Sequence, residues 1–142
     1  MNLDEGIERF AAAQQDVYQQ ALQEIKNGKK QSHWMWYIFP QIRGLGFTDY
    51  NVYYGIKDLN EARAYLNDPV LGKRLIEISE AVLSQQRKTA LEIFGRPDDR
   101  KLKSCMTLFS RIENTDPVFQ KVLDKYYNGE YDDKTISLLN EQ

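Results

Sequence analysis

Helix-start signals recur along this chain, and apolar residues follow each signal at helical spacing. Asp68-Pro69 and Asp116-Pro117 each place a capping carboxylate directly before a proline, which is favoured at the first position of a helix. Asp58 precedes Glu61 by three positions, the spacing of a capping box. Apolar residues then recur every three or four positions, and this periodicity predicts amphipathic helices.

Together the signals predict an all-α domain of about seven or eight helices, arranged as an orthogonal bundle or a short horseshoe. One long first helix is expected from the apolar stripe between Ile7 and Ile25. A short second helix would be capped by Ser32 and would stop before Pro40. Residues 49–54 fit either a short helix or a turn. Further helix starts are expected at Asp58, Asp68, Thr89, Asp98 or Asp99, Asp116, and Asp132 or Asp133.

Length and composition are those of one ordinary globular domain spanning residues 1–142. Hydrophobic residues make up 42% of the chain and charged residues 28%. The net charge of −2 gives no general attraction for nucleic acid or an anionic membrane. Cys105 is the single cysteine, so no intrachain disulfide can form, which fits a reducing compartment. Residues 1–5 lack the features of a signal peptide, and no apolar run approaches the ~20 residues of a membrane span. These features predict a cytoplasmic protein.

The run from Ser32 to Pro40 holds the only histidine and both tryptophans. On a helix, His33, Trp36 and Tyr37 would share one face, while Trp34 would point roughly 200° away from Trp36. We therefore expect Trp34 in the core and Trp36 at the wall of a cleft. In that cleft the rings would stack on a ligand, and His33 would donate a proton or bind an anion. The alternative is an aromatic core helix in which His33 bonds to the backbone.

A second cluster runs from Asp98 to Phe109. Lys101 and Ser104 lie one helical turn apart, and a desolvated lysine can activate a serine nucleophile. The alternative interpretation is a solvated charged face above an apolar stripe. A basic patch that could attract an anionic ligand is formed by Arg96, Arg100, Lys101 and Lys103.

Several familiar signatures are missing from the sequence. One histidine and one cysteine cannot build a usual zinc site. Gly44-Leu45-Gly46 lacks the third glycine of a dinucleotide-binding loop. The sequence therefore predicts neither a metal site nor a cofactor.

Several segments resemble the domain of unknown function 1810 family. They are residues 32–41, 61–66, 69–72 and 97–109. The resemblance implies a compact all-α domain with no established activity. Some members are labelled calpastatin, a label that this aromatic-rich sequence does not support. The family is also associated with macro-domain and ADP-ribose pathways, which would fit a pocket for a nucleotide-like anion.

The matching motifs point to particular residues, with two departures. Cys105 stands where the family usually has a second serine, and Asp68 stands where a histidine is common. The matching positions are Ser32, His33, Trp34, Trp36, Pro40, Gln41, Gly55, Asp98, Lys101, Ser104 and Thr107.

The resulting hypothesis is a cleft between the first helix, the second helix and the helix from Asp98 to Arg111. It would bind a small anionic, nucleotide-like ligand, with or without hydrolysis. The candidate catalytic residues are His33, Lys101 and Ser104. The candidate ligand-binding residues are Ser32, Trp36, Tyr37, Gln41, Asp98 and Thr107. The alternative is a non-catalytic module whose aromatic surface binds another protein. Membranes and nucleic acid are disfavoured as partners.

Overall fold

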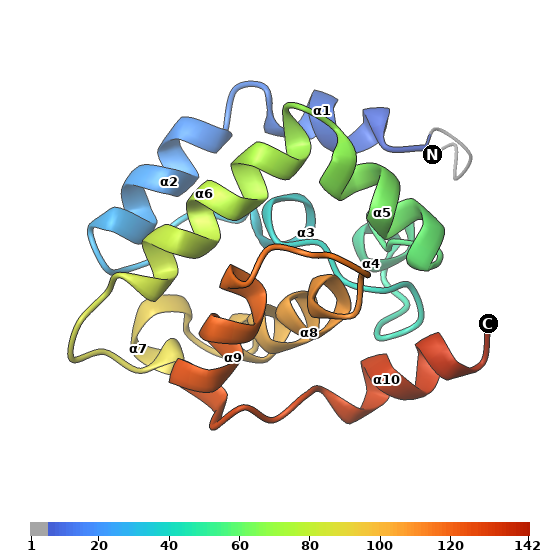
Figure 1. Cartoon of the computed structure of the whole chain (residues 1–142). Helices are drawn as coiled ribbons and strands as arrows, with labels where there is room; N and C mark the ends of the chain where they lie inside the picture. The colour runs from blue at the N-terminus through green and yellow to red at the C-terminus, as the bar shows by residue number, and fades with distance from the viewer. Residues whose placement is uncertain (1–5) are drawn as a thin grey trace.

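The computed structural model describes residues 6–142, and over this part of the chain the protein is built from helices (Figure 1). They are α1 (Glu8–Gln14), α2 (Tyr18–Lys26), α3 (Met35–Ile38), α4 (Asp49–Tyr53), α5 (Leu59–Asn67), α6 (Leu71–Leu83), α7 (Ala90–Phe94), α8 (Asp98–Ser110), α9 (Val118–Tyr127) and α10 (Asp133–Asn140). Among these residues the only β-type pairing is one isolated parallel bridge between Ile42 and Ile56. The predicted all-α class is confirmed.

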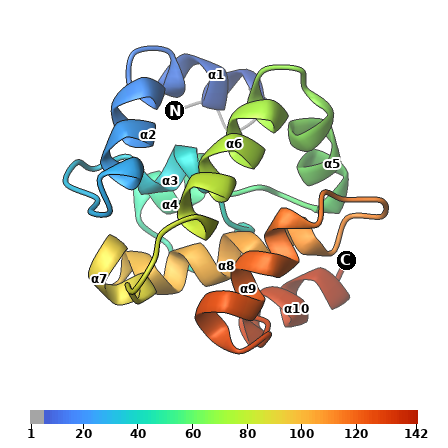
Figure 2. The same ribbon diagram turned by 60° about the vertical axis from the view of Figure 1, so that its left-hand side comes forward.

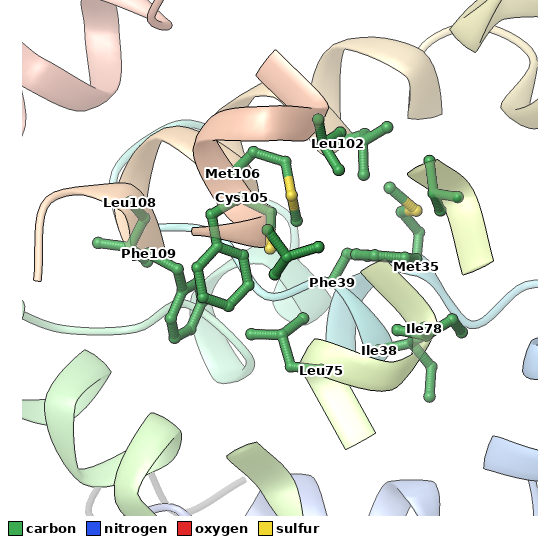
Figure 3. Close-up of a cluster of buried hydrophobic side chains, with 14 of the residues drawn as sticks. Met35, Ile38, Phe39, Leu75, Ile78, Leu102, Cys105, Met106, Leu108 and Phe109 are labelled. Atoms are coloured by element: carbon green, nitrogen blue, oxygen red, sulfur yellow. The ribbon is translucent and has the colours of Figure 1, made fainter. Parts of the chain in front are cut away.

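Helix α8 lies at the centre of the arrangement. It packs against α9, α7, α10 and α5, while α6 packs against α9, α2 and α5 (Figures 1 and 2). Side chains from α3, α6 and α8 meet in the core, where Phe39, Leu75 and Phe109 lie close to Cys105 (Figure 3). The C-terminal helix α10 runs along the outside of α8, and this contact positions one side of the site described below.

The predicted single first helix is wrong, because the chain turns between Gln14 and Tyr18 and forms α1 and α2. The apolar stripe is interrupted for one helical turn here, where the buried residue is the polar Gln14. The Gln14 amide donates hydrogen bonds to the carbonyl of Tyr37 and the hydroxyl of Tyr65, both 2.8 Å away. The turn lets α1 pack on α3 while α2 packs on α6. This break and the short helix α4 bring the described part of the chain to ten helices, more than expected.

The predicted cap at Ser32 is also wrong. Helix α3 begins at Met35, so His33 lies on a loop rather than in a first helical turn. Ser32 instead donates its hydroxyl to the carboxylate of Glu24 at 2.7 Å, and its backbone N–H goes to the same carboxylate. The two tryptophans separate as expected: Trp34 is 0% exposed and Trp36 is half-buried.

Most other helix boundaries follow the predicted local chemistry. Asp58 and Asp132 cap α5 and α10 through their side chains. Thr89 forms a complete capping box with its partner Glu92. Asp68 accepts hydrogen bonds from the backbone N–H groups that lead into α6. Within residues 6–142, every helix is too short or too polar to cross a membrane.

Candidate functional site

A groove of about 370 Å³ lies between the loop after α3, the first turns of α8 and the start of α10. The loop and α4 contribute Gln41, Leu45, Gly46 and Asn51. Helix α8 and the residue before it contribute Pro97, Arg100, Lys101 and Ser104, and the start of α10 contributes Asp132 and Lys134. The groove therefore depends on three segments that are far apart in the sequence.

An aromatic surface adjoins the groove. Trp36, Tyr50 and Tyr54 line a small pit of about 20 Å³, which also borders on the groove residues Gln41 and Asn51. The rings of Trp36 and Tyr50 meet edge to face with centroids 5.1 Å apart. On their outer side they line an open depression of about 380 Å³. Aromatic faces of this kind can stack on a planar ligand.

The groove carries more positive than negative charge. Its cations are Arg100, Lys101 and Lys134, and within residues 6–142 neither Arg100 nor Lys134 forms an ion pair. The one carboxylate in the lining, Asp132, accepts hydrogen bonds from the backbone and hydroxyl of Thr135 as the cap of α10. Arginine and lysine side chains bind phosphate and carboxylate groups by charge-assisted hydrogen bonds.

Lys101 joins the charged groove to the aromatic surface. Its Nζ lies 3.6 Å from Oδ1 of Asp98 and 4.8 Å from the ring centroid of Trp36. The other oxygen of Asp98 lies 2.8 Å from Nζ of Lys30, on the loop that precedes α3. Asp98 thus sits between two lysines and holds Lys101 beside the ring. It is not among the groove-lining residues, which makes it a positioning residue in this arrangement.

The backbone of Arg43 lies beside the pit residue Gly55. Its Cα and Cβ lie 2.8 Å from the position that a Cβ on the pit residue Gly55 would occupy. The Nε and Nη2 atoms of Arg43 are buried and have no hydrogen-bond partner among residues 6–142. Buried N–H donors without an acceptor are unfavourable.

Four of the residues predicted from the sequence lie at this site. Gln41, Lys101 and Ser104 line the groove, and Trp36 lines the pit. Ser104 donates its hydroxyl to the carbonyl of Arg100 at 3.2 Å, so its hydrogen-bond partner is the preceding helical turn rather than Lys101.

The other predicted residues have different surroundings. Thr107 is fully buried and accepts a hydrogen bond from the backbone of Asp132 at 2.9 Å. Tyr37 packs against Tyr54 with ring centroids 5.3 Å apart. Ser32 forms hydrogen bonds with Glu24, as described above. Asp98 forms ion pairs with Lys30 and Lys101. His33 is exposed and does not line the groove or the pit, so its catalytic role stays a prediction.

The expected frame of the cleft needs correction as well. The first helix, now α1 and α2, contributes no lining residue, and α4 and α10 take its place. Sequence reasoning missed Tyr50, Asn51 and Lys134. The family resemblance includes Gly55, which lies two residues after the end of α4, so it indicated this region of the chain. Lys134 gave no signal, because it reaches the groove only through the packing of α10 on α8.

Among residues 6–142, no group of three or more histidine, cysteine, aspartate or glutamate side chains is placed to hold a metal ion. The arrangement is suited to binding a molecule with an anionic end and a planar end.

Comparison with known proteins identifies the family of the chain. The model of a family described as "Protein of unknown function (DUF1810)" matches residues 4–139. The chain belongs to the DUF1810 family. A solved structure similar to this DUF1810 protein is that of the conserved hypothetical protein Rv1873 from Mycobacterium tuberculosis. The two are 46% identical and superpose with a TM-score of 0.93, over 94% of this chain and 96% of the other. No curated protein matches the chain.

Proposed function

We propose that the groove and the adjoining aromatic surface bind a small anionic, nucleotide-like ligand. The observation that carries this proposal is the position of Lys101, which lines the cationic groove and whose Nζ lies 4.8 Å from the ring centroid of Trp36. An anionic group would contact Arg100, Lys101 and Lys134, while a planar group would pack on the aromatic side chains.

Binding has more support than hydrolysis. Lys101 contacts Asp98 and Trp36, and the hydroxyl of Ser104 is bound to a backbone carbonyl. This geometry favours Lys101 as an anion-binding group over Lys101 as the activator of a serine nucleophile. Hydrolysis of the bound ligand, with His33, Lys101 and Ser104 as the candidate residues, is the second part of the proposal.

The test is ligand-induced stabilisation, measured by thermal unfolding and by calorimetric titration at low salt. The probes are inorganic phosphate, pyrophosphate and nucleoside mono- and diphosphates. A ligand at a hundred times its dissociation constant stabilises the folded state by ~2.7 kcal/mol. Lys101→Met and Lys134→Met should each weaken binding about tenfold or more.

Lys73→Met provides the matched control, because Lys73 is exposed on α6, away from the groove. It should bind like the unaltered protein. The proposal fails if none of the probes stabilises the protein, or if the control weakens binding as much as the groove variants do.

A protein-interaction module is the second candidate function. It is favoured by Phe47 and by Tyr50, three positions later in the chain, whose side chains are 83% and 51% exposed. Large exposed apolar side chains that lie together are typical of interaction sites. If this reading holds, Phe47→Ser should abolish capture of a protein partner without changing the binding of anions.

We also propose that the protein acts in the cytoplasm and uses neither a membrane nor nucleic acid as its partner. The support is a single, buried free cysteine and a net charge of −2.

A further inference from the structure

Two carboxamide side chains lie at the boundary between the aromatic pit and the cationic groove. Gln41 and Asn51 line both hollows, with Trp36 on one side and Lys101 on the other. A ligand whose ring lies against the aromatic surface and whose anion reaches the groove must pass these two amides.

Both side-chain amides are free to bind a ligand. Within residues 6–142, the hydrogen bonds of Gln41 and Asn51 involve only their backbones. The N–H of Ile56 donates to the carbonyl of Gln41 at 2.8 Å, and the N–H of Asn51 donates to Oγ1 of Thr48 at 3.2 Å. The backbones are thus held in place while each side chain keeps an unused donor and an unused acceptor.

Gly46 fixes the place of the Asn51 amide. A Cβ on Gly46 would lie 2.4 Å from Nδ2 of Asn51, so this amide packs directly on the glycine backbone. The φ angle of Gly46 lies outside the left-handed region, unlike that of Gly44. Glycine at position 46 therefore leaves space for the amide and is not needed for its backbone conformation.

We infer that Gln41 and Asn51 recognise the polar edge of the ligand's ring, and that the ligand is a phosphate or polyphosphate ester carrying a nucleobase. This inference rests on the proposed function and makes it more specific. A carboxamide offers a donor and an acceptor side by side, and it pairs in bidentate fashion with the matching groups on a base edge. An aromatic anion without such an edge leaves both amides unpaired, which lowers its affinity.

The experiment compares nucleoside 5′-monophosphates of the common bases with phenyl phosphate, an aromatic phosphate without a hydrogen-bonding edge. Calorimetric titration of the unaltered protein should show at least one monophosphate binding about tenfold or more tightly than phenyl phosphate. Asn51→Leu and Gln41→Leu should each reduce this preference severalfold, because each variant should weaken nucleotide binding more than the binding of phenyl phosphate.

Gly46→Ala supplies a second, independent variant. Alanine fits the backbone at this position, and its Cβ displaces only the flexible end of Asn51. The variant should therefore keep the melting temperature of the unaltered protein and still lose preference for the nucleobase. Gln86→Leu, at an exposed position between α6 and α7, is the control and should keep the full preference.

The outcomes separate this inference from the proposed function. Equal affinity for phenyl phosphate and every monophosphate, or a preference that survives all three site variants, would overturn the inference and leave anion binding intact. Failure of phosphate, phenyl phosphate and nucleotides alike to bind would overturn both. Binding of nucleotides without any binding of phenyl phosphate would support the inference in its strongest form.

Discussion

Glu24 shows how one buried carboxylate can redirect a stretch of chain. It accepts hydrogen bonds from the backbone of Gln31 and Ser32, the hydroxyl of Ser32 and the indole of Trp34. Burial alone would raise the pKa of Glu24, but the hydrogen bonds from Ser32 and Gln31 outweigh it and lower the pKa to about 2. These bonds to a charged acceptor explain why Ser32 does not cap α3.

Glu24→Gln should make the protein less stable at neutral pH, by about 1–3 kcal/mol in the free energy of unfolding. The folded-state pKa of Glu24 lies below its ordinary value of 4.5. Its stabilisation is therefore complete above that value and is lost as the pH falls towards about 2. Urea denaturation should show the gap between the two proteins closing between about pH 5 and pH 2. A gap that stays constant over this range would contradict the assigned role.

At the scale of elements, local chemistry predicted most helix starts, because a capping side chain and the backbone N–H that donates to it lie within three residues of each other. Prediction from local sequence failed where a residue distant in the chain forms a hydrogen bond with the residue in question. The hydroxyl of Ser32 donates a hydrogen bond to Glu24 instead of capping α3. The predicted first helix breaks where the Gln14 amide donates hydrogen bonds to Tyr37 and Tyr65. Trp34 and Trp36 separate as predicted, but Trp34 precedes the first residue of α3, so the helical geometry behind that prediction does not apply to it.

Arg9 ties α1 to the segment that carries the aromatic surface. Its side chain is fully buried, and it donates hydrogen bonds to the carbonyls of Tyr53 and Gly55 and to the carboxylate of Glu61, 2.8 Å away. Arg9→Met should lower the free energy of unfolding by about 3–5 kcal/mol, because it leaves the Glu61 carboxylate buried without its partner. The double variant Arg9→Met/Glu61→Met should be more stable than this single variant. Chemical denaturation of the three proteins gives the comparison, and additive effects would rule out the coupling.

At the scale of the whole molecule, the site forms where segments separated by up to about ninety positions meet. Sequence motifs identified Trp36, Gln41, Lys101 and Ser104, because each lies in a run of distinctive residues. Lys134 lies in an ordinary amphipathic helix, and its presence in the groove follows from how α10 returns along α8. Tertiary packing of this kind leaves no mark on local sequence, so the position of Lys134, one of the three cations of the groove, could not have been predicted.

Thr107 connects that packing to the groove. The residue is fully buried on α8, and its Oγ1 accepts a hydrogen bond from the backbone of Asp132, at the start of the helix that carries Lys134. Thr107→Val keeps the shape of the side chain but removes this acceptor, at a cost of about 1–3 kcal/mol in the free energy of unfolding. Because α10 is then held less firmly against α8, phosphate affinity should fall severalfold although no ligand contact is removed. Thr107→Ser restores the hydroxyl and should recover most of the affinity. Calorimetric titration of both variants makes the comparison, and an unchanged affinity in Thr107→Val would show that α10 keeps Lys134 in place without this bond.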